Sequence, residues 1–303
     1  MQVVLFGYGS MGVRVFDGLR RLAAEVEDPP RIARVFTHED APGEELWFDS
    51  LEERATAAAV PTHRVAPYRL CRPEAFAPEI GFDTIFISAG FRSRIASSSL
   101  TRVRGAYNFH PSLLPAYRGR SPINWAVLHG ETEVGLTLHH MVEELDAGPI
   151  VAQRRLIIGP DEMIEGVVNR VDAEIEPLLG EHWPALANGR AAATPQDHSA
   201  AQYHGGRRPE DGRLDWRWSA RRLHNVVRAV SRPFPGAFFE RGGCRLFVWR
   251  TRVLEVPSPG PGLGAGISDE GFLLGTGEGV LEVLRFGLDG GPEEAGKGLE
   301  SHW

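Results

Sequence analysis

Residues that build covalent or metal cross-links are scarce in this sequence. It has 2 cysteines in 303 residues, Cys71 and Cys244, too few and too isolated for a disulfide framework or a thiolate metal site. No group of histidine, cysteine and acidic residues has metal-ligand spacing. His139 and His140 are adjacent on an expected strand and therefore face opposite sides, so we interpret the pair as structural. We expect no metal.

Lysine and long apolar runs are also scarce. Lys297 is the single lysine, and no run reaches the ~18 apolar residues that a membrane-spanning helix needs. Residues 1–6 carry no basic region before an apolar strand pattern, so we expect no signal peptide and a cytoplasmic protein. The net charge of -7 disfavours non-specific binding to nucleic acid or an anionic membrane. Apolar residues make up 42% of the chain, enough for a full core.

Strand and helix patterns alternate along the first part of the chain. A parallel sheet with helices on both faces explains such alternation, so we expect a doubly wound, mostly parallel α/β fold of the Rossmann-like kind. The expected strands are residues 2–6, 31–37, 83–88, 106–109 and 135–141, and the expected helices are residues 13–22, 49–59, 122–129 and 162–187.

The texture changes after residue 190. Residues 191–206 are mostly small and polar and include Pro195, Gly205 and Gly206, which is typical of a linker. One expected helix, 220–231, is then followed by expected short strands separated by turns, at 237–240, 245–253, 271–275 and 280–286. We therefore expect a catalytic domain over residues 1–195 and a smaller β-rich domain, an OB-like barrel, over residues 207–303.

A glycine motif lies between the first strand and the first helix. Gly7-Tyr8-Gly9-Ser10-Met11-Gly12 matches the dinucleotide fingerprint, and Glu39 and Asp40 follow the second strand, where a ribose would bind. This motif alone allows an NAD-dependent oxidoreductase. It also allows a tight turn needed only for packing, or a helix start whose backbone N–H groups receive an anion on another substrate.

A second motif runs from Tyr107 to Trp125. Asn108 and His110 are two residues apart at the end of an expected strand, so their side chains share one face. The carboxyl ends of the strands line the active crevice of such a sheet. An amide donor beside an imidazole suits acyl transfer to an amine, which needs a donor for the oxyanion and a group that moves a proton near pH 7. Taken singly, Asn108 also fits a turn cap and His110 a surface histidine.

The whole motif resembles the N10-formyltetrahydrofolate-dependent formyltransferases. The segments that carry the resemblance are Asn108-Phe-His-Pro-Ser-Leu-Leu-Pro115, Tyr117-Arg-Gly119 and Leu145-Asp-Ala-Gly148. It extends over nearly the whole chain, through residues 36–44, 130–139, 146–153 and 223–230. It is closest to the formyltransferase part of the enzyme that modifies UDP-4-amino-4-deoxyarabinose for lipid A. Hydroxyornithine and methionyl-tRNA formyltransferases are similar as well.

The resemblance implies a catalytic centre and a co-substrate. His110 would handle the proton of the attacking amine, Asn108 would donate to the oxyanion, and Asp146 would orient the imidazole and favour its charged form. N10-formyltetrahydrofolate would be the co-substrate, with no metal. The folate contacts implied are Ser93, Arg94, Ile95, Arg120, Val142, Glu143, Glu144 and Leu145. Gly9 and Ser10 would meet the acceptor.

The acceptor class follows from charge. A tRNA enzyme would need a basic insertion near residues 38–48, and this stretch is acidic. Arginines of the C-terminal domain are compatible with a small anionic acceptor, so we expect a nucleotide-linked amino sugar, with N-hydroxyornithine and then methionyl-tRNA as alternatives. The stretch Ser88-Ala-Gly90 departs from the aromatic residues of the sugar enzyme. A non-catalytic folate-binding scaffold is disfavoured because all three catalytic residues are present. We expect no membrane partner, and the charge disfavours a nucleic-acid partner. We expect the protein to be a monomer or a homodimer.

Overall fold

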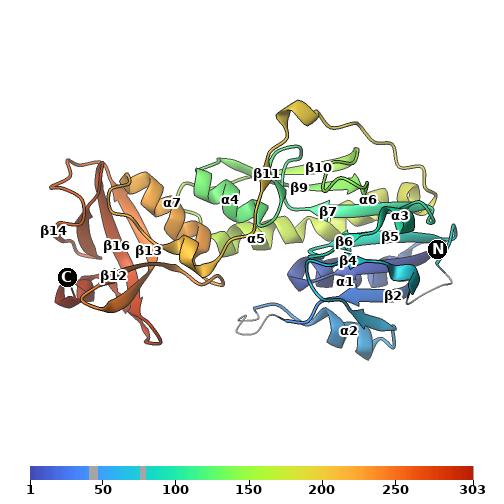
Figure 1. Ribbon diagram of the computed structural model, residues 1–303, viewed down its shortest axis with the longest axis horizontal. Coiled ribbons are helices and arrows are strands. Elements are labelled where there is room, and N and C mark those ends of the chain that lie inside the picture. The colour runs from blue at the N-terminus through green and yellow to red at the C-terminus, as the bar shows by residue number, and fades with distance from the viewer. Residues whose placement is uncertain (41–46, 76–79, 303) are drawn as a thin grey trace. The chain divides into compact units, whose positions relative to one another are not determined.

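The computed structural model describes residues 1–40, 47–75 and 80–302. The chain divides into two compact units (Figure 1). The first comprises Met1–Gly119, Val134–Leu156 and Asn169–Tyr203, and the second comprises Arg120–Glu133, Ile157–Val168 and His204–Trp303. Two segments from the middle of the sequence thus group with the C-terminal residues. The domain limits at residues 195 and 207 stay a prediction.

A mostly parallel sheet forms the centre of the first unit. Within the described residues its strands run in the order β10-β9-β7-β5-β1-β2-β3. The pairs from β3 to β7 are parallel, and β9 is antiparallel to β7. The strands are β1 (Gln2–Gly7), β2 (Arg31–Thr37), β3 (Thr62–Arg64), β5 (Thr84–Ala89), β7 (Gly105–His110), β9 (Glu133–His140) and β10 (Ile150–Ile157). This sheet confirms the expected fold class.

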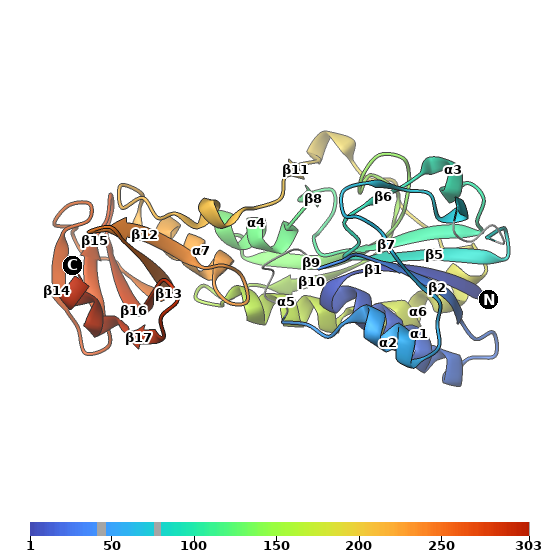
Figure 2. The same cartoon turned by 60° about the horizontal axis from the view of Figure 1, so that its bottom comes forward.

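Helices and short strands cover the two faces of this sheet (Figure 2). Helices α1 (Gly9–Glu25), α2 (Leu51–Ala57) and α6 (Ile175–Ala187) lie on one face, with α3 (Ser97–Leu100) on the other. The parallel pair β4 (Leu70–Cys71) and β6 (Arg94–Ile95) also lies on the α3 face. Helix α5 (Ile164–Ala173) directly precedes α6. The sheet is therefore covered on both faces, as its buried parallel strands require.

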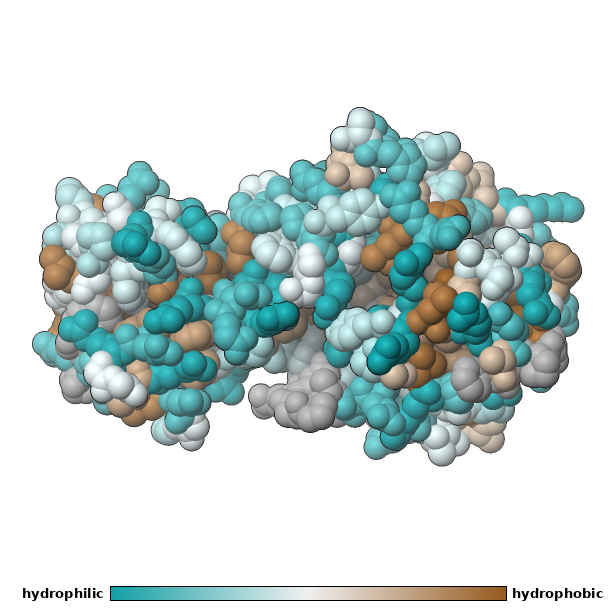
Figure 3. All heavy atoms as spheres, viewed as in Figure 1, coloured by the Kyte–Doolittle hydropathy of each residue, from teal (hydrophilic) through white to brown (hydrophobic). Residues whose placement is uncertain are grey.

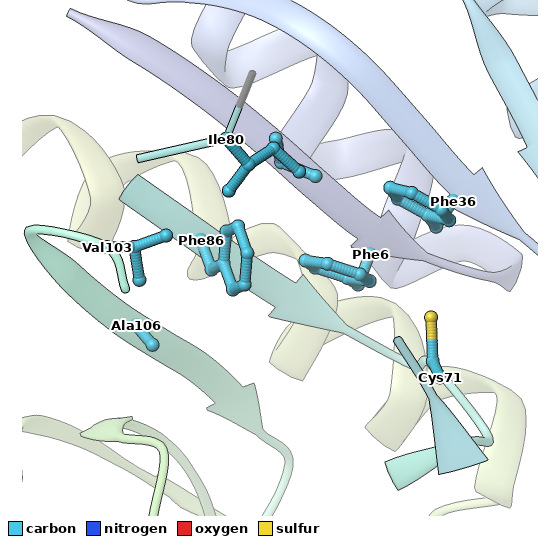
Figure 4. Packing of buried hydrophobic residues seen from close by; sticks show 8 residues of the cluster. Phe6, Phe36, Cys71, Ile80, Phe86, Val103 and Ala106 are labelled. Atoms are coloured by element: carbon cyan, nitrogen blue, oxygen red, sulfur yellow. The ribbon is translucent and has the colours of Figure 1, made fainter. Parts of the chain in front are cut away.

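Aromatic residues fill the core on the α3 face. Phe6, Phe36 and Phe86 come from three neighbouring strands and lie close together (Figure 4). The rings of Phe6 and Phe36 stack with centroids 5.0 Å apart, and Phe86 meets Phe6 edge-on at 5.0 Å. Burying each ring contributes roughly 1.5–3 kcal/mol to stability. The packing explains why β1 and β5 read as almost continuous apolar runs, and why β2 is buried at its carboxyl end.

The second unit is built on an antiparallel sheet. Its strands run in the order β12-β13-β16-β15-β14, and β17 pairs with β16. The strands are β12 (Ala237–Arg241), β13 (Cys244–Leu254), β14 (Gly264–Ile267), β15 (Phe272–Gly275), β16 (Val280–Leu288) and β17 (Glu293–Ala295). The unit also contains α4 (Pro122–His129) and α7 (Ala220–Val230), joined by a hydrogen bond from the Asn124 side chain to the Ala229 carbonyl at 2.8 Å. The expected β-rich C-terminal region is confirmed.

Local signals explain where several helices begin. Ser50 and Ser219 cap α2 and α7, each accepting a backbone N–H three residues ahead. Pro122 opens α4, where its missing N–H costs nothing. Short elements complete the fold: β8 (Arg118–Gly119) paired with β11 (Tyr203–His204), and the 3-10 turns Pro73–Ala75, His198–Ala200, Pro209–Gly212 and Gly296–His302. On the face shown in Figure 3, hydrophilic residues predominate and hydrophobic ones form small groups.

Candidate active site

The end of β7 brings together the side chains that the sequence motif singled out. Asn108 is half-buried and His110 is 4% exposed. In the antiparallel register between β7 and β9, Asn108 lies opposite His139. Residues directly opposite on such a pair of strands share a face and touch. The site is therefore built from the end of a central strand and its antiparallel neighbour.

One nitrogen of His110 is committed to a backbone carbonyl. Its Nε2 lies 2.8 Å from the carbonyl oxygen of Tyr117, and because a carbonyl only accepts, Nε2 carries a hydrogen. Its Nδ1 lies 3.6 Å from Oδ2 of Asp146, too far for a good hydrogen bond. In the neutral ring, Nδ1 is therefore the nitrogen with a lone pair, and it faces a carboxylate.

Asp146 is 8% exposed and is held by a backbone donor. Its Oδ2 accepts the N–H of Gly119 at 2.9 Å. Its φ of 53° lies in the left-handed region, and so does the φ of 58° at Tyr117, the residue that holds His110. Such conformations cost roughly 1–3 kcal/mol each in a residue other than glycine and cluster at functional sites. The surrounding fold thus stabilises a strained backbone on both sides of His110.

His139 orients the amide of Asn108. Its Nδ1 donates to the carbonyl of His140 at 2.8 Å, which leaves Nε2 as an acceptor for Asn108 Nδ2 at 3.1 Å. Burial lowers the pKa of His139 to about 4, although the carboxylate of Asp146 opposes this effect. The ring is therefore neutral near pH 7. The second N–H of Asn108 is only loosely engaged, because Nδ2 lies 3.5 Å from Asp146 Oδ1.

A buried arginine and a glutamine support the segments around this centre. Arg118 is 1% exposed and donates from Nε and Nη2 to Oε1 of Gln196 at 3.1 and 2.7 Å. The amide of Gln196 in turn donates to the carbonyls of Asp146 and Gly148 at 2.8 and 2.7 Å. The strand segment with the Gly119 donor and the loop with Asp146 are thereby joined. Our sequence interpretation assigned no such role to Arg118 and no role to Gln196, and it interpreted His139 as a structural histidine.

The two segments predicted to contact folate lie against each other. Arg94 Nη2 donates to the carbonyl of Glu143 at 3.1 Å, and Ser93 Oγ donates to the carbonyl of Ala66 at 3.1 Å. In the second segment, Glu144 accepts the hydroxyl of Tyr203 at 2.6 Å. Val142 and Leu145 leave 42% and 45% of their surface exposed, as apolar contacts for a flat ring would require. Ile95 is partly buried at the end of β6.

Arg120, another predicted folate contact, belongs to the second unit. Its backbone N–H donates to the carbonyl of His204 at 2.9 Å. Its guanidinium lies against Gly206, where an added Cβ would come within 2.3 Å of Cζ. Its role in folate binding stays a prediction.

The glycine motif is explained in part by close packing. A Cβ on Gly12 would lie 3.0 Å from the backbone of Gly7, and Gly9 has a φ of 66°. Gly9 and Ser10 begin α1, whose first turn contains no acidic residue. A hollow beside this turn is lined by Tyr8, Gly9, His38, Asp40, Phe48 and Arg64 among others. Glu39 and Asp40 are exposed, whereas residues 41–46 of the acidic stretch lie outside the described residues.

Metal-binding clusters and membrane-spanning helices are both absent from the sequence prediction, and the structure describes most of the chain in which they could lie. Within residues 1–40, 47–75 and 80–302, no group of three or more histidine, cysteine or acidic side chains is arranged to hold a metal ion. In the same ranges, no helix has the length and apolar character needed to cross a membrane.

Solved structures similar to this chain share its fold. An N-formyltransferase from Helicobacter canadensis, in complex with folinic acid and dTDP-3-aminofucose, has a TM-score of 0.73 at 16% identity, over 93% of this chain and 98% of that one. A sugar N-formyltransferase from a Shewanella species gives 0.63 at 20%, over 82% and 96%. HypX from Aquifex aeolicus, in complex with tetrahydrofolic acid, gives 0.62 at 18%, over 99% of this chain and 46% of that one.

Family models match both parts of the sequence. Residues 1–179 match the formyl transferase model, and residues 207–299 match the model of the formyl transferase C-terminal domain. The first match includes Asn108, His110 and Asp146, and it also includes the glycine motif that alone allowed an oxidoreductase. With more than half of the sequence matched and the polar cluster in place at the end of β7, the chain belongs to the formyl transferase family.

Proposed function

We propose that this enzyme transfers the formyl group of N10-formyltetrahydrofolate to the primary amine of a small acceptor. The observation that carries the proposal is the cluster at the end of β7. Asn108, His110 and Asp146 meet there, with one N–H of Asn108 only loosely engaged and Nδ1 of His110 facing the carboxyl group of Asp146. The folate supplies the formyl carbon.

His110 takes the proton of the amine. The attacking nitrogen must be unprotonated, and as its bond to the formyl carbon forms, it loses a proton. Nδ1 of His110 is the ring nitrogen that accepts it, directly or through a water, because Nε2 is held by Tyr117. The carboxylate of Asp146 faces the charge that results. When the bond between the formyl carbon and N10 breaks, the same proton returns to N10.

Asn108 stabilises the oxyanion. One N–H of its amide is held by His139 and the other is only loosely engaged by Asp146. This second N–H is the donor for the negative oxygen that develops on the formyl carbon. A neutral His139 matters here, because the opposite amide orientation would place Oδ1 against the lone pair of Nε2 and the carboxylate of Asp146.

The folate fits the two joined segments. Ser93, Arg94 and Ile95 on one side, and Val142, Glu143, Glu144 and Leu145 on the other, offer backbone groups and exposed apolar side chains. A pteridine needs both kinds of contact, since its ring faces are apolar and its edge carries donors and acceptors. The complexes of the Helicobacter enzyme and of HypX with folate compounds support the same co-substrate.

For the acceptor we propose a nucleotide-linked amino sugar. The first turn of α1, with Gly9 and Ser10, presents backbone N–H groups without nearby carboxylates of its own helix. The Helicobacter enzyme, in complex with dTDP-3-aminofucose, supports this class. The net charge of -7 opposes long-range attraction to RNA. N-hydroxyornithine and methionyl-tRNA are the alternatives that the test must separate.

The test measures formyl transfer from N10-formyltetrahydrofolate to a panel of acceptors across a salt series. The panel contains UDP- and dTDP-linked amino sugars, N-hydroxyornithine and methionyl-tRNA. We expect turnover of an amino sugar with a shallow dependence of kcat/KM on salt. A tRNA substrate that neutralises several phosphates would instead show a steep decline. Turnover of methionyl-tRNA or of N-hydroxyornithine alone would reject the proposed acceptor and leave formyl transfer intact.

A further inference from the structure

A buried histidine outside the catalytic cluster lies between two loops. His38 directly follows β2 and is 4% exposed. It lies in the hollow beside the glycine turn, and the catalytic steps described above do not use it. Burial of a polar ring is costly unless each polar atom finds a partner. The partners of His38 therefore show what the ring is for.

Both ring nitrogens of His38 are hydrogen-bonded to backbone, with opposite roles. Nδ1 lies 2.7 Å from the carbonyl oxygen of Val65, and the backbone N–H of Arg92 donates to Nε2 at 2.7 Å. A carbonyl only accepts and an N–H only donates, so one tautomer of the neutral ring satisfies both bonds. Burial lowers the pKa of His38; the hydrogen bond to Val65 opposes this effect, and the nearby charge of Arg92 adds to it.

The same ring also packs against the residue before Arg92. Phe91 stacks on His38 with centroids 4.3 Å apart and an interplanar angle of 17°. Phe91 in turn meets Phe6 of the aromatic core edge-on at 5.4 Å. His38 thus fixes two consecutive residues, Phe91 by its face and Arg92 by its edge, immediately before the predicted folate contacts Ser93, Arg94 and Ile95.

The segment that His38 holds is also tied further along. The N–H of Tyr68 donates to the carbonyl of Arg92 at 3.2 Å, and Ser93 bonds Ala66. Strand β6, with Arg94 and Ile95, pairs with β4. A Cβ at Gly90 would lie 2.4 Å from the carbonyl of Tyr8, so the chain enters this segment through a position with no room for a side chain. The side chain of His38 joins the entry of the segment to Val65.

We infer that His38 is a positioning residue for the folate site, which sets the placement of residues 91–95 before the co-substrate binds. The inference rests on the proposed function, because it takes residues 93–95 as folate contacts. Preorganised contacts bind more tightly because less order has to be imposed on binding. Loss of the His38 hydrogen bonds to Val65 and Arg92 therefore weakens folate binding. The groups at the end of β7, and the chemistry, stay unchanged.

The experiment compares His38→Leu with His38→Gln. Leucine fills the space but bonds neither Val65 nor Arg92, whereas the amide of glutamine has one donor and one acceptor. With two backbone groups left unpaired, we expect the Kd for 5-formyltetrahydrofolate and the KM for the formyl donor to rise about tenfold in His38→Leu. We expect kcat and the KM for the acceptor to stay within about twofold. His38→Gln restores most of the folate affinity.

His63→Leu is the matched control, because His63 also packs edge-on against an aromatic core residue, Phe36, and lies outside the predicted folate contacts. Folding is checked by circular dichroism. If His38→Leu does not fold, Phe91→Leu takes its place, since it removes the stacked ring and retains both hydrogen bonds. We expect a smaller rise in Kd there.

The outcomes separate the inference from the proposed function. If the wild-type enzyme does not bind 5-formyltetrahydrofolate, the folate site itself is refuted. If the wild type binds it and the folded His38→Leu or Phe91→Leu variant binds equally well, the positioning role is refuted. A fall in kcat at unchanged folate affinity also overturns the inference.

Discussion

Two strand ends of the same sheet carry the two strongest motifs of this sequence, and they differ in what they bury. At the end of β7, His110, His139 and Asp146 are all 8% exposed or less, and each has polar partners. At the end of β1, the glycine turn lies beside the exposed Glu39 and Asp40, and Gly7 and Gly12 have close backbone neighbours. His38 and Asp172 are buried near this turn, but neither belongs to the motif. Polar groups are buried at a cost that chemistry can justify. The glycines of the turn, by contrast, are explained by close packing and need no role in chemistry.

The largest expected effect is a loss of activity on substitution at the end of β7. We expect Asn108→Ala and His110→Ala to fold normally and to lose formyl transfer by about a hundred- to a thousand-fold, because each removes a group that we propose acts in the transition state. The measurement is turnover at saturating substrates, with circular dichroism as the folding check. Near-wild-type rates in either variant would show that β7 does not carry the catalytic centre.

Asp172, a buried carboxylate beside the glycine turn, makes the stability of the protein depend on pH. Burial raises the pKa of Asp172 to about 6 from 3.8, opposed by the Ser10 hydroxyl and by Arg14. Its contribution to stability is therefore fully present below pH 3.8 and is lost as pH rises through 6. Relative to Asp172→Asn, we expect the wild type to lose about 2–3 kcal/mol between pH 4 and pH 7.

Urea unfolding of both proteins across this pH range measures the difference. Asp269→Asn, which changes an exposed carboxyl of the second unit, is the control and should follow the wild type. A constant gap between Asp172→Asn and the wild type would mean that Asp172 is not held in a neutral, buried state at low pH.

Gly12 tests whether the glycine turn exists for packing. A Cβ there would lie 3.0 Å from the backbone of Gly7 and 3.1 Å from the Leu51 side chain. We expect Gly12→Ala to lower the free energy of unfolding by about 1–3 kcal/mol through overpacking, with kcat per folded enzyme retained. Gly180→Ala in α6 is the control, because its Cβ would meet only Leu22 at 3.8 Å. A stable Gly12→Ala enzyme with a raised acceptor KM would instead favour acceptor binding at the turn.

The smallest expected effect concerns His139. In His139→Leu the amide of Asn108 loses its acceptor, and we expect kcat to fall about tenfold at unchanged folate affinity. His140→Leu is the control on the opposite face of β9 and should leave kcat nearly unchanged. Equal kcat values in the two variants would contradict the orienting role of His139.

The sequence alone predicted the type of fold and the principal residues of the site, because both depend on local signals. The apolar residues of the first two strands are visible in the sequence, and the strands expected at residues 2–6 and 31–37 are observed as Gln2–Gly7 and Arg31–Thr37. The expected helix 162–187 proved to be two, α5 and α6, separated at Glu174. Edge strand β10 was not predicted, because its burial alternates weakly and Arg154 and Arg155 interrupt the apolar pattern.

Only the tertiary structure decided which other groups act on the predicted residues. His139 reaches Asn108 because β9 is antiparallel to β7 in one register, and a shift of one residue would turn it to the other face. Gln196 holds Asp146 from a segment that the sequence marked as linker. Such contacts join residues far apart along the chain, and local periodicity contains no information about them. The sequence determined which chemical groups are present, whereas strand register and long-range packing determined their orientation and protonation.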